Sequence, residues 1–348
     1  MRPCGVFNET YKKDIAIVRT WQHWTILVAT IVLLFLLPLF TSYYIITLLN
    51  FIFITVIVVL GLQIVTGYCG QISIGQPAFM AVGAFTSAVL TIHFGLSFWL
   101  ALPIAGIAAG IVGLIGGAPS MRVKGFYLAM ATIAIFYVTM WVITHMDITG
   151  RTQGLNPPPP QLGDFAFDTD ERMYYLILIV TLLMTFFARN LVRSRVGRVF
   201  VAIRDNDLAA EVMGVNVYYY KLLAFFISCI YAGIGGSLLG HWYTVVNSEQ
   251  FTLIHGIEYI GMIIIGGTGS IPGVFFGVFM IRLLDELVIF ASPLISETFP
   301  LIGIGQSFSL GLSSFGLILI LFLVFEPRGI AHRWEIFKTS YRIYPYRD

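Results

Sequence analysis

Charged side chains are scarce in this sequence, and so are cysteines. Asp, Glu, Lys and Arg make up 11% of the 348 residues, whereas hydrophobic residues make up 58%. Soluble globular proteins carry about 25% charged residues, so this composition indicates an integral membrane protein. The net charge of +2, with Lys and Arg spread over several loops, provides no basic face for nucleic acid. Cys4, Cys69 and Cys229 are too widely spaced for a zinc motif or a disulfide framework.

Enzyme motifs are also missing. The sequence has no Gly-x-x-x-x-Gly-Lys-Ser/Thr loop for ATP, no His-Glu-x-x-His motif and no Gly-x-Ser-x-Gly motif. The six histidines are scattered, so no metal site is expected. We therefore expect no catalytic residue and no bound cofactor. If ATP drives this protein, a partner subunit has to hydrolyse it.

Long apolar runs occupy most of the chain. A helix needs about 20 residues to cross the hydrocarbon core of a bilayer. We therefore predict an all-α, polytopic transmembrane helical bundle of about 8–10 spans, surrounded by membrane lipid. Hydropathy suggests ten segments, of which the eighth and ninth are either two short spans or one re-entrant hairpin: 24–40, 43–66, 77–93, 97–118, 126–145, 173–188, 219–241, 255–266, 273–291 and 308–325.

The distribution of basic residues predicts the orientation. Four lie in the N-terminal tail, two in the 119–125 turn, six in the central loop and its flanks and five in the C-terminal tail, together seventeen of the twenty Lys and Arg residues. Because cytoplasmic loops are enriched in Lys and Arg, both termini are expected in the cytoplasm. The resulting division is a cytoplasmic tail at 1–23, a transmembrane domain at 24–326 with an extracytoplasmic loop at 146–172 and a cytoplasmic central loop at 189–218, and a cytoplasmic tail at 327–348.

Glycine and proline interrupt the apolar runs twice. The first break is Gly-Tyr-Cys-Gly-Gln-Ile-Ser-Ile-Gly-Gln-Pro at 67–77, and the second is Gly-Gly-Thr-Gly-Ser-Ile-Pro-Gly at 266–273. Non-helical backbone at membrane depth has to be buried in protein or to line a wet cavity, so these breaks indicate a substrate pathway. A tight cytoplasmic turn is the alternative for each break. The candidate pathway residues are Gly70, Gln71, Ser73, Gln76, Pro77, Gly267, Thr268, Ser270 and Pro272.

Each break is expected to start a new helix. Pro77 and Pro272 stand where proline suits the first helical turn, and the hydroxyls of Ser73 and Ser270 are close enough to act as N-caps. A helix N-terminus inside the membrane carries partial positive charge and free N–H groups. It can therefore attract the carboxylate of a substrate.

Ionisable residues within apolar segments are functional candidates by default. Arg282 and Asp285 are spaced i, i+3, so we favour a structural ion pair over a proton relay. Glu258 has no obvious local partner, and the alternative to a functional role for it is a position near the water interface.

Four stretches carry short motifs in a fixed order along the chain. They are the first break with its continuation to 85, Arg-Val-Lys-Gly-Phe-Tyr-Leu-Ala-Met-Ala-Thr at 122–132, Ala-Ile-Arg-Asp-Asn-Asp-Leu-Ala-Ala-Glu-Val-Met-Gly-Val-Asn at 202–216, and Ile-Gly-Gly-Thr-Gly-Ser-Ile-Pro-Gly at 265–273. Together they resemble the inner-membrane permeases of ABC importers for branched-chain amino acids. The third stretch lies in a charged, amphipathic loop, which is uncommon between spans.

The resemblance implies a transport subunit rather than an enzyme, in the inner membrane of a prokaryotic cell. Its implied partners are a homologous second permease, two cytoplasmic ATP-binding subunits and an extracytoplasmic substrate-binding protein. The central loop resembles the element that docks into the ATPase subunit, and the implied coupling residues are Arg204, Asp207, Ala210, Glu211 and Gly214. Pro77 and Pro272 depart from many relatives, which leaves the local geometry of both breaks open.

Other functions remain open on the sequence. Related permeases for urea and short amides share these motifs. An ion-coupled secondary transporter would use Glu258, Arg282 or Asp285 as coupling groups, and a membrane-anchored structural or signalling subunit would need no pathway at all.

Overall fold

The structure is almost entirely helical. The computed structural model describes residues 21–120, 126–163, 165–298 and, with short gaps, 316–343. Its long helices are α2 (Trp21–Leu36), α3 (Tyr43–Leu62), α4 (Gln76–Ile92), α5 (Phe98–Ser120), α6 (Phe126–His145), α7 (Asp170–Arg193), α8 (Arg195–Asp205), α10 (Val217–Tyr243), α11 (Leu253–Gly266), α12 (Ile271–Thr298) and α14 (Ile330–Ile343). The residues before 21, residues 121–125 and most of the segment expected at 308–325 lie outside the described part.

Several short elements connect these helices. Helix α3 continues into a π-helical turn, η2 (Gln63–Tyr68), and the six-residue α9 (Asp207–Val212) follows α8. Single 3₁₀ turns are η1 (Leu37–Leu39), η3 (Asp147–Thr149) and η4 (Ser248–Gln250). Strands β1 (Gln161–Leu162) and β2 (Phe165–Ala166) form a small antiparallel hairpin in the loop before α7.

Five helical segments in the described residues are long and apolar enough to cross a membrane. They are Tyr43–Tyr68, Phe98–Ser120, Tyr127–His145, Asp170–Arg193 and Val217–Tyr243. The predicted all-α polytopic membrane bundle is therefore confirmed. Helices α11 and α12 are two separate helices joined by a turn, and the 14 residues of α11 fall short of the roughly 20 that a full crossing needs.

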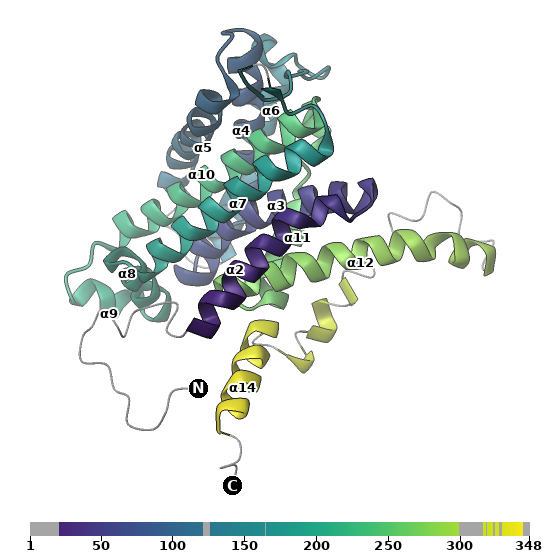
Figure 1. The fold of residues 1–348 in the computed structure, drawn as a ribbon. Helices are drawn as coiled ribbons and strands as arrows, with labels where there is room; N and C mark the ends of the chain where they lie inside the picture. The colour runs from purple at the N-terminus through teal and green to yellow at the C-terminus, as the bar shows by residue number, and fades with distance from the viewer. Residues whose placement is uncertain are drawn as a thin grey trace.

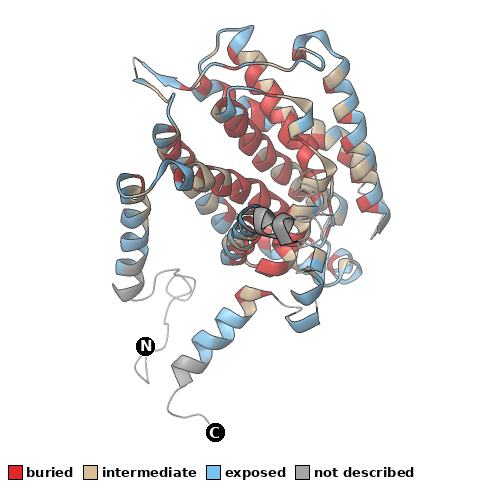
Figure 2. Cartoon of the chain, turned by 90° about the vertical axis from the view of Figure 1, so that its right-hand side faces the viewer, coloured by how far each residue is buried: buried red, intermediate tan, exposed pale blue. Residues whose placement is uncertain are grey.

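Helices α3, α4 and α10 form the centre of the bundle and contribute many of its buried residues. Buried residues concentrate in the interior of the helical bundle (Figure 2). Small residues allow α4 and α10 to pack closely: a Cβ on Gly83 would collide with the backbone of Gly233, and one on Gly236 with the carbonyl of Met80. Close packing of this kind suits a membrane, because dispersion contacts rather than hydrophobic burial hold helices together in lipid.

The two ends of α10 carry different parts of the chain. Helices α8 and α9 precede its first residue and lie at one end of the bundle (Figure 1). At its other end, the 146–172 loop is anchored: the backbones of Leu155 and Val246 exchange hydrogen bonds of 3.1 and 2.8 Å, and His241 Nδ1 lies 2.9 Å from the carbonyl oxygen of Pro158. The 27 residues of α10 span about 40 Å, so these two regions lie at opposite ends of a helix that is long enough to cross a membrane.

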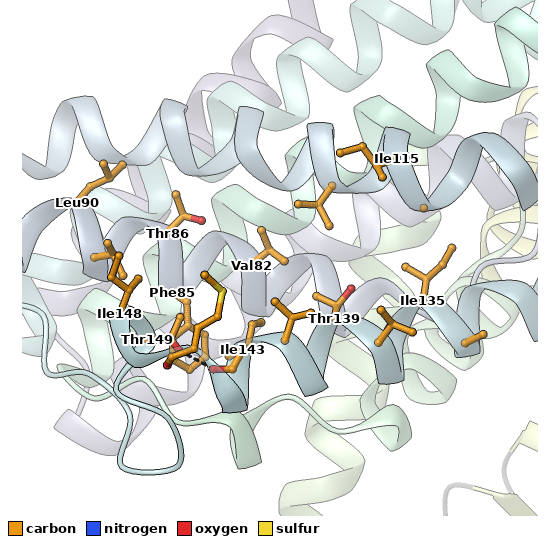
Figure 3. Close-up of a pocket in the computed structure, with 17 residues that line it drawn as sticks. Val82, Phe85, Thr86, Leu90, Ile115, Ile135, Thr139, Ile143, Ile148 and Thr149 are labelled. Atoms are coloured by element: carbon orange, nitrogen blue, oxygen red, sulfur yellow. Dashed lines mark hydrogen bonds between the residues drawn. The ribbon is translucent and has the colours of Figure 1, made fainter.

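An apolar groove of about 650 Å³ lies between α4, α5 and α6. Figure 3 shows side chains from all three helices around it, including Val82, Ile115 and Ile135. Its few hydroxyls include that of Thr149, which donates to the carbonyl oxygen of Ile143 at 2.5 Å. Because the walls are almost wholly hydrocarbon, the groove suits lipid chains or apolar helix contacts and offers no polar capture for a zwitterion.

Candidate functional site

The first break begins where α3 loses its regular helix. After η2, Gly70 adopts a left-handed conformation with φ of +74°, and the chain then runs without helix to Gln76. Pro77 lies in the first turn of α4, as predicted, but the N-cap is Gly75 and no side chain caps this helix. The expectation that Ser73 is the cap is wrong, because Ser73 lies two residues before the N-cap and its Oγ has no hydrogen-bond partner among the described residues.

The second break is a tight turn between α11 and α12. Gly267 and Gly269 take positive φ values of +112° and +77°, which glycine adopts without strain. The hydroxyl of Ser270 accepts a hydrogen bond from the Gly273 amide at 3.2 Å, so the predicted cap of α12 is confirmed. Pro272 is the second residue of this helix. Thr268 and Pro272 are exposed.

The two breaks lie against each other. Gln63 of η2 donates from Nε2 to the carbonyl oxygens of Gly267 and Ser270, both at 3.1 Å. A Cβ on Gly67 would lie 2.8 Å from the amide nitrogen of Gly269, so the backbones are nearly in contact. Residues about two hundred positions apart in the sequence thus form one junction, which we call the break junction: Gln63, Gly67, Gly267, Gly269 and Ser270.

The rest of the first break runs into the interior. The Ile74 amide donates to Thr132 Oγ1 of α6 at 3.1 Å, and Gln76 Nε2 donates to the carbonyl oxygen and Oγ of Ser228 on α10, both at 3.1 Å. Near the start of the break, Gln71 shares a cavity with Lys221 of α10. Ser228 lies seven residues beyond Lys221, so α4 starts about 10 Å deeper in the bundle. The break is therefore an extended segment, buried at Gln71, Ser73 and Gly75 but exposed at Gly70 and Ile72, rather than a tight turn.

Arg204 connects the central loop to the break junction. Its Nη1 donates to the carbonyl oxygen of Gly67 at 3.0 Å, and a Cβ on Gly269 would lie 2.9 Å from the same nitrogen. Nε and Nη2 bind Asp205 at 3.1 and 3.0 Å. The family resemblance implied a docking role for Arg204, and the structure places its guanidinium against the Gly67 carbonyl in η2.

The other predicted coupling residues lie on α9 and just after it. Ala210 is buried, Asp207 is half-buried with a carboxylate 3.5 Å from Lys221 Nζ, and Glu211 and Gly214 are exposed. Asn206 accepts from the Ala209 amide at 3.1 Å and caps α9, while Gly214, with φ of +85°, ends the turn that follows. The fold therefore presents α9 as a rigid, well-capped projection.

Sequence reasoning missed the apolar surface of this projection. Leu208, Val212 and Met213 are 64%, 87% and 83% exposed. The i, i+4 spacing of Leu208 and Val212 was the available signal, because it places both side chains on one helix face. Three large apolar side chains exposed together at the end of a membrane bundle indicate a surface that another protein covers.

An ion cluster around the buried Arg282 joins α11 and α12. Arg282, 6% exposed, lies 3.1 Å from Asp285 and 3.7 Å from Glu258, and its guanidinium stacks 4.3 Å above the Phe51 ring. The predicted Arg282–Asp285 pair is confirmed. The expectation that Glu258 lacks a partner is wrong, since His255 also lies 3.2 Å from it. The antiparallel packing of α11 on α12 brings Arg282 to Glu258, which no local spacing could reveal.

This geometry defines a class: a polytopic helical membrane protein with two broken helices that meet at one end and contact an amphipathic helix pair. Residues 44–325 match the family described as "Branched-chain amino acid transport system / permease component". The chain belongs to this family, and the resemblance of its four motif stretches is confirmed.

Curated relatives agree with this assignment. The chain is 31% identical over 269 residues to the high-affinity branched-chain amino acid transport system permease protein LivM of Escherichia coli strain K12, covering 70% of this chain and 63% of the relative. LivM of Salmonella typhimurium is 31% identical over 240 residues, which is 62% of this chain and 56% of the relative. BraD of Pseudomonas aeruginosa is 25% identical over 300 residues, covering 81% and 93%. The match to both LivM proteins thus spans less than two thirds of their length. No solved structure matches the chain.

Proposed function

We propose that this chain is the permease subunit of an ABC importer that moves branched-chain amino acids across the inner membrane of a prokaryotic cell. The relatives carry this function in their names. In our proposal, a homologous second permease completes the pathway and a soluble binding protein delivers substrate to the 146–172 side. Two ATP-binding subunits drive transport from the side of α8 and α9.

The observation that carries the proposal is the contact between Arg204 and Gly67. Helix α9 presents Leu208, Val212 and Met213 to a partner, and α8 places Arg204 on the carbonyl at the end of η2. A displacement of α8 and α9 by the ATPase therefore acts directly on the break junction. The displacement reaches both breaks, because Gln63 connects the first break to the second by hydrogen bonds.

The orientation follows from charge. Arg189, Arg193, Arg195, Arg198 and Arg204 all lie on the side of α8, whereas the 146–172 loop carries only Arg151 and Arg172 with five acidic residues. Positive charge next to membrane spans favours the cytoplasm. The end with the break junction and α9 is then cytoplasmic, where ATP is available.

Reconstitution of the complete assembly in proteoliposomes tests this function. We expect uptake of labelled leucine that requires ATP and both ATP-binding subunits, with competition by isoleucine and valine. Stronger competition by urea or acetamide would reassign the substrate to short amides. Uptake driven by an ion gradient through this chain without any ATPase would overturn the proposal in favour of a secondary transporter.

A further inference from the structure

A polar cavity of about 340 Å³ is lined by the start of the first break and by the junction of α8 and α9. This volume lies within the range of about 300–1,000 Å³ that is typical of small-molecule sites. The cavity is distinct from the apolar groove between α4, α5 and α6, since its lining includes Gln71, Arg204, Asp205, Asp207 and Lys221.

Gln71 is the most informative residue of the lining. Its side chain is only 4% exposed, and neither amide atom, Oε1 nor Nε2, has a hydrogen-bond partner among the described residues. Burying an amide without partners costs free energy, and most buried polar groups are paired. Gln71 belongs to the cavity lining, so a bound group with both kinds of hydrogen-bonding atom that reached this amide would satisfy it.

The charges around the cavity are of both signs. Lys221 lies 3.5 Å from Asp207, and Arg204 binds Asp205 at 3.0 Å, so two cations and two carboxylates line the same cavity. Lys221 keeps donors beyond the one directed at Asp207, because an ammonium group has three. The cavity can therefore hold a carboxylate and an ammonium group at once.

Part of the wall is hydrocarbon. Leu128 of α6 and Ile203 of α8, both buried, line the cavity beside the charged residues. A ligand with two opposite charges close together and an aliphatic tail fits this combination. Urea and short amides lack both the charges and the tail.

We propose that this cavity, on the side of α8 and α9, binds the transported α-amino acid before its release. The α-carboxylate lies toward Lys221 and Arg204, the α-ammonium group toward Asp205 and Asp207, and the side chain against Leu128 and Ile203. Gln71 binds the polar end of the ligand. This inference rests on the proposed function, because it takes the ligand to be the transported substrate.

Two substitutions test the site with different risks to folding. Gln71→Leu keeps nearly the same volume and removes the unpaired amide, so the thermal unfolding midpoint should stay equal or rise. Lys221→Met removes the cation but keeps the aliphatic stem. The matched controls are Gln161→Leu on β1 and Lys338→Met on α14, both of which are exposed and outside the cavity.

The measurement is equilibrium binding of tritiated L-leucine to the purified assembly in nanodiscs, with the binding protein left out. We expect saturable binding that weakens at least tenfold in Gln71→Leu and in Lys221→Met and stays unchanged in both controls. Isovalerate, which lacks the ammonium group, and isoamylamine, which lacks the carboxylate, should each compete at least tenfold more weakly than leucine.

Wild-type affinity in both cavity variants would overturn the site, and so would equal competition by either analogue. If no saturable binding occurs while the same assembly with its binding protein imports leucine, the cavity is not a ligand site but the proposed function stands. If the assembly does not import leucine at all, the proposed function fails and this inference fails with it.

Discussion

At the scale of single residues, Arg204 has a role that its charge alone does not reveal. Its guanidinium satisfies the Gly67 carbonyl and lies against Gly269, so it contacts both breaks from a helix outside them. Gly70, with φ of +74°, allows this approach, because a Cβ there would lie 3.0 Å from Arg204 Cγ. One long side chain thus joins three separate segments of the chain.

Replacing Arg204 with Gln should uncouple transport from ATP hydrolysis. Hydrogen bonds from charged donors contribute about 1.5–3 kcal/mol, so we expect leucine uptake to fall by roughly 10- to 100-fold while ATP hydrolysis by the assembly continues. Uptake and phosphate release are measured in the same proteoliposomes. Arg195→Gln, in the exposed first turn of α8, is the control and should transport normally. Wild-type uptake by Arg204→Gln would remove the proposed link.

The ion cluster of Arg282 gives a second prediction at the residue scale. Arg282→Met leaves the half-buried Glu258 and Asp285 without their cation; removing one partner of a fully buried pair costs about 3–5 kcal/mol of stability, and we expect a smaller loss here. The unfolding midpoint in detergent should therefore fall. A triple variant, Arg282→Met with Glu258→Leu and Asp285→Leu, should recover most of the loss and still import leucine. A stable triple variant without transport would instead assign the cluster a functional part, as in an ion-coupled carrier.

At the scale of elements, α9 combines rigidity with an exposed apolar surface. Asn206 caps its start, Gly214 ends the turn after it, and the pair of Asp207 and Lys221 fastens it to α10. A short helix that is capped and ion-paired in this way can transmit a displacement from a bound partner to α10 without unfolding. Its exposed apolar side chains are those expected of a binding surface, where a few large residues contribute most of the affinity.

Val212→Asp should weaken assembly with the ATP-binding subunits. Val212 is 87% exposed, so the substitution does not disturb the core, but it places a charge in an apolar interface. We expect the affinity of the ATP-binding subunits for the permease to fall at least tenfold in a binding assay with purified components. Val245→Asp, at the opposite end of α10, is the matched control. Equal affinity for both variants would show that α9 is not the docking surface.

At the scale of the whole molecule, the bundle has two unlike ends. One end gathers α8, α9, the break junction and the polar cavity, and the other holds the anchored 146–172 loop. Helices α4 and α10 run between them with their backbones in close contact. A displacement at one end can therefore travel along packed helices to the other, as alternating access requires.

Labelling of single cysteines tests this polarity. In a background without native cysteines, Val212→Cys should react with a membrane-impermeant maleimide only in inverted vesicles. Leu162→Cys on β1, which is 60% exposed, should react in intact cells. The expectation follows from the excess of positive charge on the α8 side. The reverse pattern would place α8 and α9 outside the cell and exclude a cytoplasmic ATPase as the energy source.

The sequence by itself determined the features that depend on local spacing. Long apolar runs specified the helices, glycine and proline located both breaks, and the i, i+3 spacing paired Arg282 with Asp285. Ser270 could be identified as a cap because a cap acts within one turn. Ser73 misled because its distance from the first turn of α4 depends on where the non-helical segment before α4 ends. Motif order was enough to indicate the family.

Only the tertiary structure decided which distant residues meet. Gln63 bonds to Gly267 across 204 residues and Arg204 to Gly67 across 137, and neither contact has a signature in local periodicity. The same is true of the polar cavity at Gln71 and of the contact between Glu258 and Arg282. Helical spacing constrains neighbours three or four residues apart, but the packing of whole helices determines the rest, because it alone fixes which faces and which ends come together.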